Sequence, residues 1–142
     1  MTAAPAPSVP RVLFICVENS NRSQMAEGFA RMLGGDRVVA ASAGSRPSGT
    51  VNPKAIMAMG ELGYDMALHS SKSVDAMRDQ PWDRVVTMGC GDACPWVPAE
   101  RRDDWPLPDP RDLDAGGVRA VRDEISARVR ALLGELGVPI AS

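Results

Sequence analysis

The chain has 142 residues, of which 44% are hydrophobic, and its 16 basic and 18 acidic residues give a formal net charge of −2. This length suits one domain with a single core. The near balance of charge gives no electrostatic basis for nucleic acid or an anionic membrane as partner. No apolar run approaches the roughly 20 residues that a membrane span needs.

The first residues and the cysteine count indicate where the protein works. Residues 1–10 are rich in Ala and Pro but lack the basic and apolar regions of a secretion signal, so we expect a disordered lead-in before a domain at 11–138. Three cysteines, an odd number, argue against a static disulfide framework and favour a reducing compartment. We expect a cytoplasmic monomer.

A short polar loop between two apolar segments is the first functional feature along the chain. Residues 12–15 form an apolar run typical of a buried strand, and residues 23–33 carry apolar side chains at helical spacing. Backbone N–H groups of the intervening loop converge near the helix N-terminus, which suits a tetrahedral oxyanion. Arg22 offers a planar fork of donors to two oxyanion oxygens. The helix dipole and Arg22 also favour the thiolate of Cys16, so the loop predicts thiolate attack on a phosphate-like centre.

The remaining elements alternate between strands and helices. Asn52 and Pro53 have the order of an N-cap and a first helical residue, and Gly63 is the expected end of that helix. An apolar stripe from 118 to 136 predicts an amphipathic helix, with Arg122 off the stripe. The other predicted elements are strands at 38–43 and 85–88 and a short helix at 74–77. This alternation predicts an α/β domain whose parallel sheet carries helices on both faces and binds ligands at the carboxyl ends of its strands.

Cys90 and Cys94 follow the strand at 85–88 and are therefore expected at the same sheet edge as Cys16. The glycines beside Cys90 would let the two thiols meet within disulfide distance. Two unrelated loop cysteines are the alternative. A zinc site is not expected, because the lone His69 has no partner at ligand spacing. We favour a relay in which Cys90 attacks the adduct on Cys16 and Cys94 resolves the product.

Asp109 is held between Pro108 and Pro110. A carboxyl group fixed in this way suits a general acid that meets a leaving oxygen. Asp-Pro is also a common turn dipeptide, so a capping role is an equal alternative from spacing alone. Asp103 and Asp104 are expected to be solvated.

Several of these segments together resemble the arsenate reductases built on the low-molecular-weight protein tyrosine phosphatase fold. The matching motifs are those at 16–28, 42–44, 51–55 and 86–90, Cys94-Pro95 and Asp109-Pro110, and the similarity runs from about Arg11 to Leu136. The resemblance implies a four-stranded parallel sheet, with Cys16 attacking arsenate and Asp109 protonating the departing oxygen. It implies a substrate-binding loop made of Val17, Glu18, Asn19, Ser20, Asn21, Arg22 and Ser23.

The resemblance also implies how the enzyme would be reduced. Cys90 and Cys94 match the two further cysteines of the thioredoxin-coupled branch, although their spacer is shorter than in better-known members. Thioredoxin is therefore the expected electron donor, with a low-molecular-weight thiol such as mycothiol as the alternative, and no bound cofactor is expected. The implied role is arsenic detoxification.

Some relatives bind potassium through residues that match Asn19, Glu27 and Ser42. Lys72 takes the place of a further aspartate in that site, and its ammonium group could occupy the cation position. We therefore expect no potassium requirement and no metal site.

The main alternative is a low-molecular-weight protein tyrosine phosphatase. Such an enzyme hydrolyses its thiol ester with water and needs no further cysteine, whereas a reductase needs the second thiol that Cys90 supplies. Phosphatases of this fold usually carry aromatic residues after Asp-Pro, but Arg111 and Asp112 follow here. An oxyanion-sensing regulator without turnover would need neither Asp109 nor the cysteine pair.

Overall fold

The computed structural model describes residues 9–89 and 97–140, and these residues build one four-stranded sheet of order β2-β1-β3-β4. All neighbouring strands pair in parallel, which confirms the predicted sheet. The strands are β1 (Arg11–Cys16), β2 (Val39–Gly44), β3 (Arg84–Thr87) and β4 (Arg101–Asp104). Most of the predicted lead-in, residues 1–8, lies outside the described residues.

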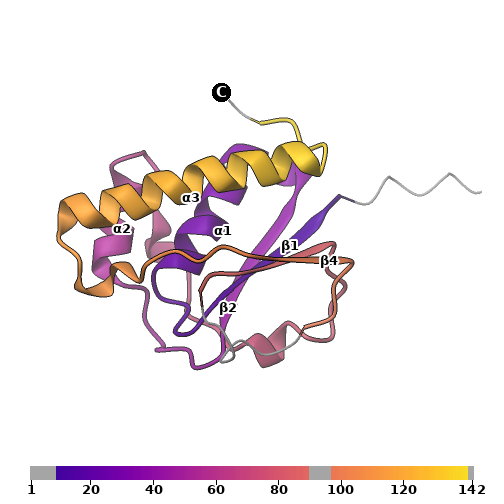
Figure 1. The fold of residues 1–142 in the computed structure, drawn as a ribbon, viewed down its shortest axis with the longest axis horizontal. Coiled ribbons are helices and arrows are strands. Elements are labelled where there is room, and N and C mark those ends of the chain that lie inside the picture. The colour runs from indigo at the N-terminus through magenta and orange to yellow at the C-terminus, as the bar shows by residue number, and fades with distance from the viewer. Residues whose placement is uncertain (1–8, 90–96, 141–142) are drawn as a thin grey trace, which may run out of the picture.

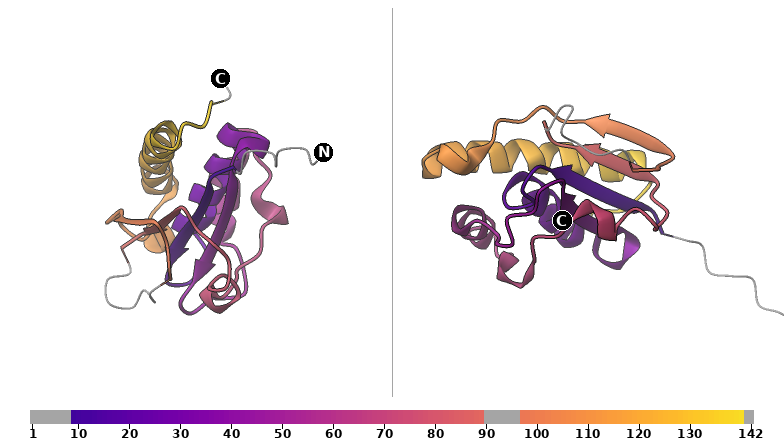
Figure 2. Two further views of the ribbon diagram at one scale, coloured as in Figure 1. Left: turned by 90° about the vertical axis from the view of Figure 1, so that its right-hand side faces the viewer. Right: turned by 90° about the horizontal axis from the view of Figure 1, so that it is seen from below.

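Helices cover both faces of the sheet, but unequally. Helices α1 (Arg22–Gly34), α2 (Pro53–Gly60) and α3 (Ala115–Glu135) share the larger core on one face. The short 3-10 helix η3 (Val74–Ala76) and the segment after it cover the other face. Figure 1 shows α3 and η3 on opposite sides of the strands, and the right-hand view of Figure 2 shows α3 running lengthwise along the sheet.

Strand β1 is buried on both faces because it lies in the interior of the sheet. Val12 and Phe14 point into the helical core, while Leu13 and Ile15 point into the smaller core. Cys16 ends the strand on the helical side. The alternation thus places the thiol at the edge where parallel strands present ligand sites.

The caps of α2 confirm the sequence prediction at its start. Asn52 Oδ1 accepts a hydrogen bond from the Lys54 N–H at 2.9 Å, and Pro53 is the first helical residue. The helix ends at Gly60 rather than at Gly63. Gly63, with φ at 85°, instead makes the turn that follows.

The expectation that Asp103 and Asp104 are solvated holds for Asp104, which is exposed, whereas Asp103 is partly buried. Parallel pairing of β4 with β3 sets them beside polar groups of the neighbouring strand. Asp103 Oδ2 accepts a 2.7 Å hydrogen bond from Arg84, and Asp104 Oδ1 accepts one of 2.7 Å from Thr87.

Arg122 also departs from the expected pattern, because it is buried although it lies off the apolar stripe of α3. Its Nη1 donates to the Ala58 carbonyl at 2.9 Å and to Glu61 at 2.7 Å. The guanidinium thereby joins α3 to α2. Among the described helices, none is both long and apolar enough to span a membrane.

Candidate active site

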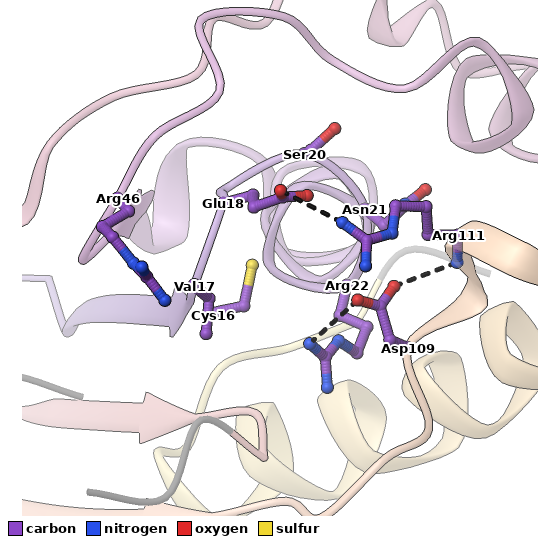
Figure 3. A pocket seen from close by; sticks show the side chains of 9 residues that line it. All are labelled: Cys16, Val17, Glu18, Ser20, Asn21, Arg22, Arg46, Asp109 and Arg111. Carbon is purple, nitrogen blue, oxygen red and sulfur yellow. Dashed lines mark hydrogen bonds and ion pairs between the residues drawn. The ribbon is translucent and has the colours of Figure 1, made fainter. Parts of the chain in front are cut away.

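A cavity of about 270 Å³ opens beside the loop that links β1 to α1. Figure 3 shows side chains from this loop and from two distant segments meeting around it. The lining residues are Cys16, Val17, Glu18, Ser20, Asn21 and Arg22 from the loop, with Arg46, Asp109 and Arg111 from elsewhere. The predicted loop, Arg22 and Asp109 therefore meet at one site.

Cys16 is almost fully buried, with 3% of its surface exposed. Its Sγ lies 2.9 Å from Ser23 Oγ, and Asn19 Nδ2 donates to that same oxygen at 2.8 Å. Because Asn19 fills an acceptor position on Ser23, the Ser23 hydroxyl proton is free to point at sulfur. A hydrogen bond to sulfur in this direction stabilises the thiolate.

Asn19 holds the loop in an uncommon backbone conformation. Its φ is 51°, in the left-handed region that Asn tolerates better than most residues. Gln24 Nε2 donates to the Asn19 carbonyl at 3.0 Å, and the Lys72 N–H donates to Asn19 Oδ1 at 2.8 Å. The conformation is thus fixed from both helix α1 and the segment near Lys72.

Arg22 is the first residue of α1, and backbone carbonyls hold one end of its guanidinium group. Nη1 donates to the carbonyls of Met88 at 2.7 Å and Leu107 at 2.9 Å. The buried Nε has no hydrogen-bond partner among the described residues, and Nη2 lies 3.9 Å from Asp109 Oδ2. Two donors are therefore left for bidentate binding of an anion.

Asp109 fits both interpretations drawn from its sequence. Oδ1 accepts a hydrogen bond from the Arg111 N–H at 2.9 Å and caps the 3-10 helix η5 (Pro110–Asp112). Oδ2 faces Arg22 across the cavity. One oxygen thus fixes the turn while the other faces the cavity.

The residues expected near a cation site also lie together. Ser42 Oγ donates to Glu27 Oε1 at 2.6 Å, and Lys72 Nζ lies 3.8 Å from the same oxygen. The Lys72 ammonium therefore lies next to the buried Glu27 carboxylate. Independence from potassium stays a prediction.

His69 connects this region to the loop, a role that sequence reasoning missed. Its Nδ1 lies 2.9 Å from Gln24 Oε1, and its Nε2 lies 2.7 Å from the Tyr64 hydroxyl. Burial lowers the pKa of His69, and the negative charge of Glu27 opposes that shift. A neutral ring accepting from Tyr64 and donating to Gln24 fits these contacts.

Arg46 and Arg111 line the cavity but were not among the predicted binding residues. Both come from segments distant from the loop, so spacing alone gave no signal for them. Cys90 and Cys94 lie outside the described residues. The chain that leads to them passes beside Arg22 at Gly89, where a Cβ atom would be 3.1 Å from Arg22 Nη1.

Comparisons with known proteins match nearly the whole described chain. Residues 11–139 match the family of low molecular weight phosphotyrosine protein phosphatases. The glutaredoxin arsenate reductase of Synechocystis sp. is 37% identical over 129 residues, which are 89% of this chain and 98% of that protein. Arsenate reductase 1 of Staphylococcus epidermidis is 42% identical over 122 residues, 83% of this chain and 91% of that protein.

Solved structures of arsenate reductases are also similar to this chain. An arsenate reductase in the phosphate binding state is 37% identical to this chain, with a TM-score of 0.83. The match covers 90% of this chain and 99% of that protein. The thioredoxin-dependent arsenate reductase of Corynebacterium glutamicum is 34% identical, with a TM-score of 0.77. The match covers 94% of this chain and 64% of that protein.

Proposed function

The chain belongs to the low molecular weight phosphotyrosine protein phosphatase family, and we propose that it acts there as an arsenate reductase. The observation that carries the proposal is the juxtaposition of a buried Cys16 thiol, two free donors of Arg22 and Oδ2 of Asp109 in one cavity. The relatives named as arsenate reductases support this choice within the family.

In the first step the Arg22 fork and the loop N–H groups would hold arsenate above Cys16. The thiolate attacks arsenic, so a sulfur–arsenic bond forms and one arsenic–oxygen bond breaks. Asp109 delivers a proton from Oδ2 to the departing oxygen, which leaves as water. The Ser23 hydroxyl stabilises the attacking sulfur.

In the second step Cys90 would attack the sulfur of Cys16. The sulfur–arsenic bond breaks with its electron pair on arsenic, which leaves as arsenite, and a Cys16–Cys90 disulfide remains. Cys94 then attacks Cys90 and frees Cys16 as thiolate. Two thiols thus supply the two electrons, and an external donor must reduce the Cys90–Cys94 disulfide.

We propose thioredoxin as that donor, because Cys90 and Cys94 match the two further cysteines of the thioredoxin-coupled branch. Mycothiol or glutaredoxin are the alternatives, and one relative is named for glutaredoxin and another for thioredoxin. No bound cofactor enters the proposal. A cytoplasmic location belongs to it, since relay thiols must be kept reduced.

The proposal is tested by arsenate-dependent oxidation of a thioredoxin and thioredoxin reductase system, measured beside hydrolysis of phenyl phosphate. We expect arsenate-dependent turnover to exceed hydrolysis, and Cys16→Ser to abolish both. Faster hydrolysis without arsenate-dependent oxidation would instead identify a phosphatase. Arsenate reduction that persists in Cys16→Ser would show that Cys16 is not the nucleophile.

A further inference from the structure

Glu18 and Arg111 form an ion pair across the cavity that the reaction steps above do not use. We propose that this pair is a specificity determinant, which makes the site select small free oxyanions over phosphate monoesters with a bulky substituent. The inference rests on the proposed function and names the feature of this chain that narrows its substrate class.

The pair joins two separate walls of the cavity. Arg111 Nη1 lies 3.2 Å from Glu18 Oε1, although the residues are 93 positions apart. Glu18 belongs to the wall made by the Cys16 loop, and Arg111 to the wall that carries Asp109. Figure 3 shows the two side chains reaching toward one another beside Asp109. The space between these walls is the space that an ester substituent would need.

Both ends of the pair are fixed through their backbones. Lys54 Nζ donates to the Arg111 carbonyl at 3.0 Å, and the Arg111 N–H is held by Asp109 Oδ1. The Glu18 carbonyl accepts hydrogen bonds from Ser71 Oγ and the Ser48 N–H, each at 3.0 Å. The two side chains therefore start from fixed positions, which lowers the entropy cost of keeping them paired.

Charge explains why the partner of Glu18 has to be a cation. A carboxylate on an oxyanion-binding loop repels the anion that the loop binds. Arg111 neutralises that charge, so a small anion still enters. A monoester meets the same pair as a steric barrier, because its substituent must displace one of the two side chains.

The binding of two probes separates the entry of a small anion from the exclusion of an ester substituent. Inorganic phosphate represents the free oxyanion, and phenylphosphonate represents a monoester that cannot be hydrolysed. The ratio of their dissociation constants is measured by calorimetry on reduced wild-type protein, Glu18→Ala, Arg111→Ala and the double variant. Each single variant should shift the ratio toward phenylphosphonate by about fivefold, the upper range for a half-exposed pair.

The double variant should shift the ratio no further than either single variant, because each single change already breaks the pair. Arg111→Lys keeps the cation and should stay near the wild-type ratio. Glu124→Ala, which breaks the exposed pair with Arg128 on α3, is the matched control and should leave the ratio unchanged. A ratio within twofold of wild type in both single variants, or additive shifts in the double variant, overturns the proposal.

The arsenate-dependent assay on the same wild-type preparation tells the two failures apart. If wild-type protein neither binds phosphate nor reduces arsenate, the proposed function falls and this inference falls with it. If it does both while the ratio stays fixed in the variants, only the role of the ion pair is overturned.

Discussion

The thiol of Cys16 depends on a chain of neighbouring side chains rather than on one contact. Asn19 donates to Ser23, and this leaves the Ser23 proton for sulfur. Gln24 and the Lys72 N–H hold Asn19 in place. The Cys16 sulfur is thus positioned before any oxyanion enters, since each donor in the chain already has its partner.

Replacing Arg22 by lysine should remove most of the oxyanion binding. An ammonium group cannot reproduce the fork formed by Nε and Nη2, nor keep Nη1 on the carbonyls of Met88 and Leu107 at the same time. We expect kcat/KM for arsenate to fall by about a hundredfold or more, the range seen when a donor to a developing oxyanion is lost. Arg130→Lys, exposed on α3, is the matched control. Near-normal turnover by Arg22→Lys would contradict the binding role of Arg22.

Replacing the two relay cysteines separately should stop the reaction at different stages. Cys90→Ser should let arsenate react at Cys16 without releasing arsenite, because no thiol can attack that sulfur. Cys94→Ser should release about one equivalent of arsenite and stall as a Cys16–Cys90 disulfide. Single-turnover arsenite release with disulfide mapping measures both. Sustained thioredoxin-driven turnover by Cys94→Ser would make Cys94 a bystander and favour a low-molecular-weight thiol as donor.

At the scale of the elements, the end of β2 supports the oxyanion loop through a close approach of backbones. A Cβ atom on Gly44 would lie 2.5 Å from the Val17 carbonyl oxygen and 2.9 Å from the Asn19 nitrogen. Neither neighbour can move away without disturbing the loop. Glycine at this position is therefore a requirement of the site as well as of the strand.

Gly44→Ala should consequently damage activity more than folding. We expect a large loss of kcat/KM for arsenate with most of the secondary structure retained. Gly134→Ala is the matched control, because a Cβ there meets nothing within 4 Å. That change in α3 should raise the free energy of unfolding by about 0.5–1 kcal/mol without changing kinetics. Equal kinetics for the two variants would show that the approach at Gly44 is not critical. Circular dichroism measures the secondary structure, urea unfolding measures the free energy of unfolding, and steady-state kinetics measure kcat/KM.

The elements that the sequence predicted are those with an apolar run, apolar side chains at helical spacing or a capping pair. The apolar run of β1 and the helical spacing in α1 and α3 gave bounds that fall within a few residues of the observed ones. Strand β4 escaped prediction because its sequence, Arg101 to Asp104, is wholly charged. A charged edge strand suits a sheet that must avoid pairing with another chain, but it has no apolar signal.

The site was predictable where each residue lies in an informative local motif. Cys16, Arg22 and Asp109 could be assigned roles from local context and resemblance, and the structure brings them together. Arg111 reaches Glu18 only through the fold, and the buried Arg122 finds partners in the Ala58 carbonyl of α2 and in Glu61, which follows α2. Such contacts between distant segments leave no periodic pattern in a single sequence.

On the scale of the whole molecule, α2 joins the segment that carries Asp109 to the core. Lys54, in its first turn, donates to the carbonyls of Arg111 and Leu113. Near its other end, Glu61 accepts from Arg119 at 2.7 Å and from Arg122 at 2.7 Å, both on α3. The position of Asp109 relative to the loop therefore depends on how firmly α2 and α3 are joined.

That junction should make stability sensitive to acid. Hydrogen bonds from Arg119 and then Arg122 lower the pKa of Glu61 from 4.5 to about 2. The folded protein thus holds the carboxylate where the unfolded chain would protonate it. The stabilisation is complete above pH 4.5 and is lost as the pH falls from there toward 2.

Glu61→Gln tests this dependence, because glutamine keeps the size but cannot titrate. Urea unfolding of both proteins between pH 7 and about pH 2.5 gives the difference in free energy of unfolding at each pH. Wild type should be the more stable at neutral pH, and its advantage should shrink below pH 4.5. Glu124→Gln, at an exposed pair within α3, is the control for loss of a surface carboxylate. A wild-type advantage that stays constant down to the lowest pH would mean that the charge of Glu61 does not join α2 to α3, and that its shape and neutral hydrogen bonds do.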